Sequence, residues 1–112
     1  MHELAIIQGV LDIVEMEAGK CSARAASRIK LRIGEFTGVV PEALEFSFES
    51  AKYGTVSEGA SLEIEMVPLR KRCRECDTEK LGGGIDFLCE KCGAGMEILS
   101  GREMQVEFID FD

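Results

Sequence analysis

The sequence predicts an α+β fold, in which two helices cover a three-stranded antiparallel sheet and a small cysteine-rich domain is inserted between the second and third strands. Two segments carry apolar residues at three- and four-residue steps, which is typical of amphipathic helices. Three segments alternate apolar and polar residues, which is typical of strands with one buried face. A chain of 112 residues is long enough for one such core and one small module.

Both helices have recognisable boundaries. Residues 3–18 form the first, and Gly19 suits the position just after its end. Gly9 lies in its middle, where glycine costs about 1 kcal/mol relative to alanine, so it calls for a packing or functional reason. The second helix begins at Pro41, since proline is favoured at the first helical position, and it ends before Gly54.

The three strands differ in the charge of their solvent-facing side chains. The first is expected over residues 26–34, the second over 62–66 with a stop at Pro68, and the third over 103–108. The polar positions of the first strand are basic, whereas those of the other two are mostly acidic. Opposite charges on neighbouring strands stabilise a sheet, so the first strand is expected to form ion pairs with its neighbours.

The inserted region holds four of the five cysteines, in two C-x2-C pairs: Cys73, Cys76, Cys89 and Cys92. One tight turn can direct two thiolates at one ion, and two such turns complete a tetrahedron. We expect Zn(II) in a closed, structural four-cysteine site, which makes the insertion a zinc-ribbon-like domain. Gly93 suits the second turn, and a hairpin tipped by residues 82–84 would bring the two turns together.

The cysteines leave other interpretations open. Iron also takes four thiolates, and two disulfides or a thioredoxin-like redox pair would use the same residues. A redox C-x2-C normally opens a helix in a βαβ unit, which this sequence lacks. Cys21 stands apart between a helix and a strand, and we expect it to be a small, partly buried thiol.

The amino terminus carries the only histidine, His2. A methionine before a bulky residue is usually kept, so the expected start is Met1-His2-Glu3. The amine of Met1, the backbone nitrogen and imidazole of His2, and the backbone nitrogen of Glu3 could together chelate a square-planar ion such as Ni(II) or Cu(II). The competing interpretations make His2 a solvated residue or a helix cap.

Composition excludes several function classes. A net charge of −8 offers no basic surface for nucleic acid. No apolar run approaches a membrane span, and the first residues do not resemble a signal peptide, so we expect a cytoplasmic protein. The sequence contains no HExxH, GxSxG or P-loop motif, so it lacks the parts of a zinc protease, a serine esterase or a nucleotide hydrolase. No enzymatic activity is predicted.

Several stretches together resemble the HypA/HybF family of nickel metallochaperones for hydrogenase maturation. They are the opening MHELAI, the two cysteine pairs, and the segments LRIGEFTGVVPEALEFSFE, GTVSEGASLEIEMVPLR and LSGREMQVEFIDF. The resemblance spans essentially the whole chain. It implies a carrier that delivers Ni(II) for maturation of [NiFe] hydrogenase, and some relatives also serve urease. The implied partners are a HypB-type GTPase and the hydrogenase large-subunit precursor.

The resemblance also assigns roles to residues and regions. His2 matches the nickel ligand, aided by Met1 and Glu3, and the four paired cysteines match structural zinc ligands. Residues 1–68 plus 101–112 would form the nickel-binding α+β domain, and residues 69–100 the zinc-binding domain. The rival functions are a zinc-ribbon adaptor without a nickel role and a thiol oxidoreductase. Both a monomer and a homodimer are compatible with the sequence.

Overall fold

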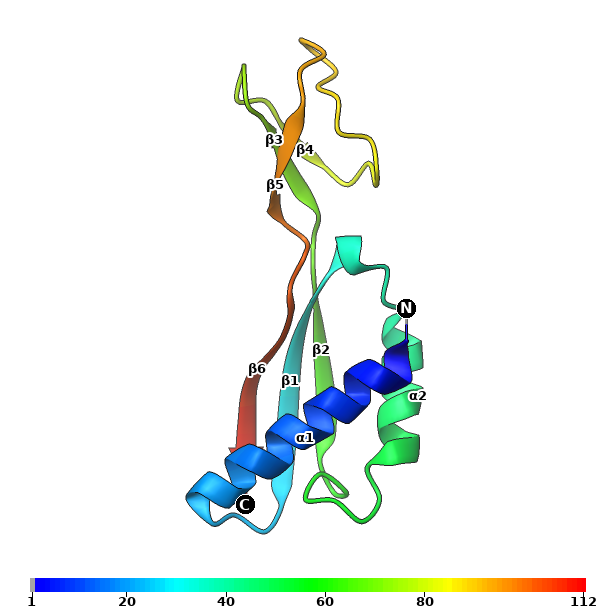
Figure 1. Ribbon diagram of the computed structural model, residues 1–112, viewed down its shortest axis with the longest axis vertical. Coiled ribbons are helices and arrows are strands. Elements are labelled where there is room, and N and C mark those ends of the chain that lie inside the picture. The colour runs from blue at the N-terminus through cyan, green and yellow to red at the C-terminus, as the bar shows by residue number, and fades with distance from the viewer. Residues whose placement is uncertain (1) are drawn as a thin grey trace.

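The computed structural model describes residues 2–112. These residues form an elongated molecule of 55 × 25 × 16 Å, with two three-stranded sheets one beyond the other along the long axis (Figure 1). The predicted fold class is confirmed, because two helices cover one sheet and the four-cysteine region forms the other. Within the described residues, neither helix has the length and apolar character that crossing a membrane requires.

The larger sheet has the order β2–β1–β6. Its strands are β1 (Ala26–Gly34), β2 (Ser61–Val67) and β6 (Met104–Phe111). β6 pairs with β1 antiparallel, as predicted, but β2 pairs with β1 parallel, so the expected all-antiparallel sheet is corrected at this pair. The reason is the second helix, because a chain that crosses over through a helix returns to the starting end of the sheet and runs parallel to its first strand.

Two helices, α1 (Glu3–Cys21) and α2 (Pro41–Ala51), provide the cover for this sheet (Figure 1). Their buried faces and the inward side of β1 form one apolar core, to which Ile7, Leu31 and Phe48 belong. Pro41 begins α2 as predicted. The residues of α1 continue past the predicted end, and Ser22 rather than Gly19 takes the left-handed position after it, with φ 57°.

Packing among residues 2–112 does not explain Gly9. It is exposed, and a Cβ atom added there would meet nothing within 4 Å. Together with Ile13, Met104 and Val106 it lines a shallow apolar hollow of about 210 Å³ between α1 and β6.

The predicted ion pairs across the sheet are confirmed. Lys30 of β1 lies between Glu65 of β2 and Glu107 of β6, with nitrogen–oxygen distances of 3.2 and 3.3 Å. Arg28 bridges the same two strands through Glu63 and Asp110 at 3.3 and 3.5 Å. The basic strand is therefore the central one, where each cation can reach carboxylates on both sides.

The smaller sheet has the order β4–β3–β5, and both pairings are antiparallel. Its strands are β3 (Arg70–Cys73), β4 (Glu79–Leu81) and β5 (Met96–Ser100). A short 3-10 helix, η1 (Glu35–Thr37), follows β1 at the junction between the two sheets (Figure 1). We call residues 69–100 the cysteine module.

Candidate functional site

The two cysteine pairs sit in turns with the same hydrogen bonding. In the first turn, the amide of Asp77 donates to the carbonyl of Cys73 at 3.1 Å, and the amide of Cys73 donates to the carbonyl of Thr78 at 2.8 Å. In the second turn, the amides of Gly93 and Cys89 make the equivalent bonds, both at 2.8 Å. Each turn therefore holds its two thiols on the same side of the backbone.

Each turn also needs one residue with positive φ, directly after its second cysteine. Gly93 occupies that position in the second turn with φ 75°, as predicted. Asp77 occupies it in the first turn with φ 61°, although a non-glycine residue is uncommon there. Aspartate is among the side chains that tolerate this conformation best, and the sequence alone did not reveal the equivalence.

The predicted hairpin tipped by residues 82–84 is wrong. The first cysteine pair lies at the tip of the β3–β4 hairpin, and the second lies in its own turn, closed by a bridge between Leu88 and Gly95. Residues 82–84 instead begin the loop that connects the two turns. The glycines there have φ between 52° and 82°, so the loop can reverse direction tightly.

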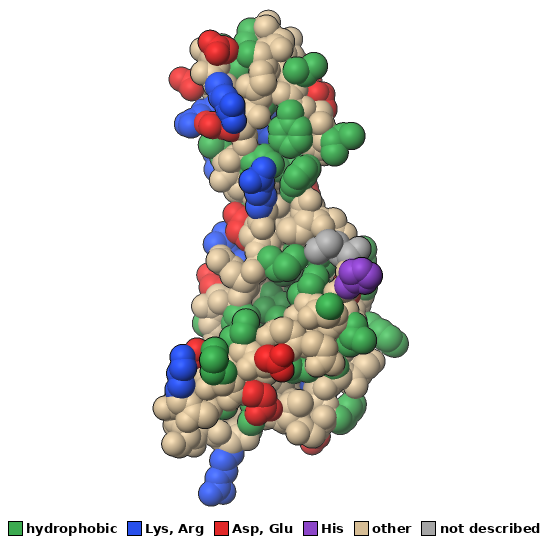
Figure 2. Space-filling view, viewed as in Figure 1, with side chains coloured by type: hydrophobic (Ala, Val, Ile, Leu, Met, Phe, Trp, Pro, Cys, Tyr) green, Lys and Arg blue, Asp and Glu red, His purple; other side chains and the backbone are tan. Residues whose placement is uncertain are grey.

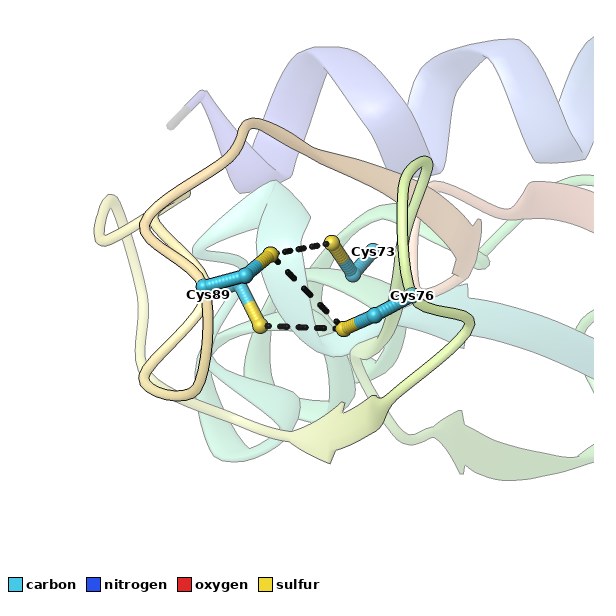
Figure 3. Close-up of side chains that lie close together, drawn as sticks. Cys73, Cys76 and Cys89 are labelled. Carbon is cyan, nitrogen blue, oxygen red and sulfur yellow. Dashed lines mark hydrogen bonds between the residues drawn. The ribbon is translucent and has the colours of Figure 1, made fainter.

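The four sulfur atoms converge, with every pair within 4.8 Å (Figure 3). Cys73 Sγ lies 3.4 Å from Cys92 Sγ, and Cys76 Sγ lies 3.7 Å from the sulfurs of both Cys89 and Cys92. Four thiolates at about 2.3 Å from one zinc ion would be about 3.8 Å apart, which is close to these separations. A disulfide needs about 2.0 Å between sulfurs, and all four thiols are free. The residues therefore fit one tetrahedral ion.

The thiols differ in their tendency to ionise. The Thr78 hydroxyl, 3.2 Å from Cys76 Sγ, and the Thr78 amide lower the pKa of the Cys76 thiol to about 6. Backbone amides of the second turn lower the pKa of Cys89. At Cys92 a backbone amide lowers the pKa, but the neighbouring thiols and the partial loss of water around the sulfur raise it to about 12. A metal cation would draw the remaining protons off, because the thiolate is the form that binds metal.

The cysteine cluster is buried on one side and reaches the surface on the other. Cys73 and Cys89 are buried, and Cys76 and Cys92 are exposed. Four thiolates fill a tetrahedral coordination sphere and leave no position for a substrate or a reactive water. None of the four cysteines lies in a helix, so the helix start that activates a redox C-x2-C pair is missing. The geometry supports a structural metal site.

Cys21 lies at the end of α1, far from these four in the fold. The expectation that it is partly buried is wrong, because the residue is exposed. Its thiol reaches back 3.7 Å to the carbonyl of Ala18 at the last turn of the helix.

The amino-terminal segment lies on the surface of the larger unit, below the cysteine module in Figure 2. His2 is exposed and precedes α1, and its side chain makes no capping hydrogen bond. His2 is thus the N-cap residue of α1 by position and through its backbone carbonyl, which accepts from the Ile6 amide at 3.1 Å, and its side chain takes no part in the cap. Met1 lies outside the described residues. The segment is separate from the cysteine cluster, so the structure does not combine the two sets of predicted ligands into one site.

Glu3 is the first residue of α1, and its side chain has a role of its own. A carboxylate oxygen accepts a hydrogen bond from the amide of Val40 at 3.4 Å. The Glu3 amide and then the Val40 amide lower the pKa of this carboxyl. The contact joins the start of α1 to the segment that leads into α2.

A model of one protein family matches residues 1–111, and its description is hydrogenase/urease nickel incorporation, metallochaperone, hypA. The chain belongs to the HypA family. Relatives with the name hydrogenase maturation factor HypA include one from Moorella thermoacetica, 41% identical over 111 residues and 98% of each chain. Another, from Geobacter metallireducens, is 42% identical over 113 residues and the full length of both chains.

The HypA fold is also found among solved structures. The solution structure of the nickel metallochaperone HypA from Helicobacter pylori has a TM-score of 0.71, covers 99% of this chain and 97% of its own, and is 24% identical. A second HypA solution structure has a TM-score of 0.74 at the same identity. HypA proteins are metallochaperones and maturation factors, so this family member is not an enzyme.

Proposed function

We propose that this chain carries Ni(II) at its amino terminus and delivers it for maturation of [NiFe] hydrogenase, with Zn(II) held structurally by the cysteine cluster. The observation that carries the nickel proposal is the state of His2 in a chain of the nickel-incorporation family. Its imidazole is exposed and forms no side-chain cap, so it is available as a ligand.

The start of α1 supplies the remaining donors. The first amides of a helix have no hydrogen-bond partner within the helix. Here the first amide that has one is that of Ile6, which donates to the carbonyl of His2 at 3.1 Å. The backbone nitrogens of His2 and Glu3 therefore have no intrahelical partner to give up, and the Glu3 amide would exchange its contact with the Glu3 carboxylate for the metal. With the imidazole and the amine of Met1 they make a set of four nitrogens, which favours square-planar Ni(II).

The side chain of Glu3 positions this set. The Glu3 carboxylate accepts a hydrogen bond from the Val40 amide, so we propose the backbone nitrogen of Glu3, and not its carboxylate, as the metal donor. A shallow site on an exposed segment suits a carrier, because cargo must leave as well as bind. All of these nitrogens must lose protons to ligate, so affinity should fall with falling pH.

The four cysteines Cys73, Cys76, Cys89 and Cys92 would hold Zn(II), since their sulfur separations match its thiolate geometry. The zinc would stabilise the cysteine module and take no part in nickel transfer as a ligand. Residues 1–68 with 101–112 would form the nickel-binding domain, and residues 69–100 the zinc-binding domain. A HypB-type GTPase and the hydrogenase large-subunit precursor are the proposed partners, in the cytoplasm, for a monomer or homodimer. Urease maturation is a further proposed destination.

Calorimetric titration of Ni(II) into the untagged, zinc-loaded protein tests the nickel site. We expect His2→Ala to weaken binding at least about tenfold, since one strong donor is lost, equivalent to about 1.4 kcal/mol. Gln8→Ala, on the exposed side of the same helix, is the matched control and should bind as the wild type does. Equal affinity in His2→Ala and wild type would refute the nickel site and favour a zinc-ribbon adaptor.

A further inference from the structure

Lys71 is the most unusual residue of the cysteine module. It is charged, yet it is completely buried, with 0% of its surface exposed. Lysine is almost never fully buried without partners, because removing its charge from water is costly. Strand alternation explains the direction of the side chain, since Lys71 and Cys73 both face inward on β3. The hydrogen-bond partners of its ammonium group identify the segment that Lys71 holds in place.

Those partners all come from the loop over residues 82–88. Lys71 Nζ donates to the carbonyls of Gly84 and Asp86 at 2.8 and 2.5 Å. It also lies 4.3 Å from the centre of the Phe87 ring, within the range of a cation–π contact. No carboxylate of the described residues forms an ion pair with it. The buried charge is satisfied by the shape of this loop, so the loop is held against β3.

Phe87 then connects the module to the larger unit. Its ring meets that of Phe36 in η1 edge to face, with centroids 5.7 Å apart. Both residues are half-buried. In Figure 1 the yellow loop descends toward the cyan 3-10 helix, to one side of the two connecting segments. The contact lies to one side of the covalent connections between the two sheets.

The two connecting segments meet η1 and the end of β1 in one small region. The Phe36 amide donates to the carbonyl of Gly101 at 2.8 Å, and the Leu69 amide donates to the Glu35 carboxylate at 3.2 Å. A Cβ atom at Gly34 would lie 2.0 Å from the oxygen of Gly101, so the two backbones touch here. A few hydrogen bonds in one small region resist rotation of the cysteine module only weakly, so a contact to one side of that region limits the rotation further.

We propose that Lys71, Phe87 and Phe36 form a clamp that fixes the orientation of the cysteine module relative to the unit that carries His2. Lys71 holds the loop through its two carbonyls, the loop places the Phe87 ring, and this ring packs against Phe36 in η1. The three are positioning residues, since no hydrogen bond among the described residues joins them to the cysteine sulfurs, to His2 or to Glu3. The inference concerns orientation and holds whether or not His2 binds nickel.

Residual dipolar couplings of backbone amides test the clamp in the full, zinc-loaded chain. In the wild type, one alignment tensor should fit the amides of both sheets. Phe36→Ala should remove the shared tensor and shrink the couplings of the cysteine module, while zinc content stays at the wild-type level. Phe36 lies outside the module, so its loss does not endanger the fold of the zinc site. Phe46→Ala is the matched control, because Phe46 is an exposed phenylalanine on α2.

Lys71→Met tests the inner half of the clamp. Methionine keeps an unbranched apolar chain beside Phe87 but cannot donate to the two carbonyls. We expect faster amide exchange in residues 82–88 and loss of the shared tensor. If this variant fails to fold, Phe36→Ala still decides the matter. A wild type that needs two tensors, or a Phe36→Ala variant that keeps one, would overturn the proposal.

Discussion

The larger sheet is covered by a continuous apolar core, to which both helices and the central strand contribute through residues such as Ile7, Leu31 and Phe48. The smaller sheet has no comparable core, since its buried cluster consists of Cys73, Cys89 and Met96 with Ala94 packed against them. Both regions have three strands, so strand number does not explain the difference. A module of about thirty residues cannot bury enough apolar surface to hold itself together, and in the proposed metal-bound state the cross-linked thiolates would replace that burial.

Removing one thiolate should have the largest effect on the difference between the two regions. Cys73→Ser, or chelation of the metal, should unfold the cysteine module and leave the larger unit folded, because metal-binding energy is folding energy for such modules. Native mass spectrometry should show one zinc per wild-type chain and none in the variant. Amide spectra should lose the dispersed signals of residues 69–100 alone. A metal-free, fully folded module would show that metal binding does not supply its folding energy.

The reciprocal variant is Phe48→Ala, in the core of the larger unit, where Phe48 is fully buried. It should destabilise that unit by about 3–5 kcal/mol in urea unfolding, while the folded protein keeps its zinc.

A smaller effect should separate the two cysteine turns. Gly93→Ala places a side chain at φ 75°, so we expect a cost of about 1–2 kcal/mol, seen as roughly tenfold weaker zinc binding against a competing chelator. Asp77→Gly relaxes the equivalent position, at φ 61°, and should leave zinc affinity near the wild-type value. Equal loss in both variants would show that the backbone conformation after the second cysteine does not control zinc affinity.

The smallest expected effect concerns the charged face of the larger sheet. A hydrogen bond from Lys30 lowers the pKa of Glu65 below 4.5. The folded state therefore binds this proton less readily than the unfolded state, so the contribution to stability is present above pH 4.5 and is lost as pH falls through the lowered value. Because both groups are on the surface, the contribution is small.

Urea unfolding of the larger unit, followed between about pH 6 and pH 3 by amide signals of β1, measures this effect. Glu65→Gln should lose part of the acid dependence. Glu45→Gln is the matched control, since Glu45 is an exposed carboxylate for which the described structure shows no ion pair. The same slope in Glu65→Gln and wild type would show that the ion pairs on this face do not affect stability.

Much of the fold follows from local patterns. Alternation in residues 26–34 and the start of α2 at Pro41 are local properties, and the structure has both elements at those positions. The direction of β2 is not local. It depends on which way the crossover through α2 returns the chain, and this made one of the two predicted pairings wrong. Similarly, the run of glycines at residues 82–84 indicates a turn, but nothing in it says which segments the turn brings together.

In the cysteine module too, some residues can be identified from the sequence and others only from the structure. The C-x2-C spacing alone identifies the four thiols that converge, because two residues between cysteines allow few backbone conformations. Lys71 gives no such signal, since a lysine between two arginines in RKRC suggests a solvated strand. Only the register of β3 and the path of the loop over residues 82–88 bury its charge.

The sequence by itself determined the two α-helices, the three strands of the larger sheet, the four-cysteine cluster and the placement of the single histidine at the amino end, because each depends on residue types at short spacing. The tertiary structure decided the mixed pairing of the larger sheet, the exposure of a His2 side chain that makes no capping hydrogen bond, and the contact of Phe87 with Phe36. These features arise between segments far apart in the chain. Their free energies depend on packing that short-range patterns do not encode.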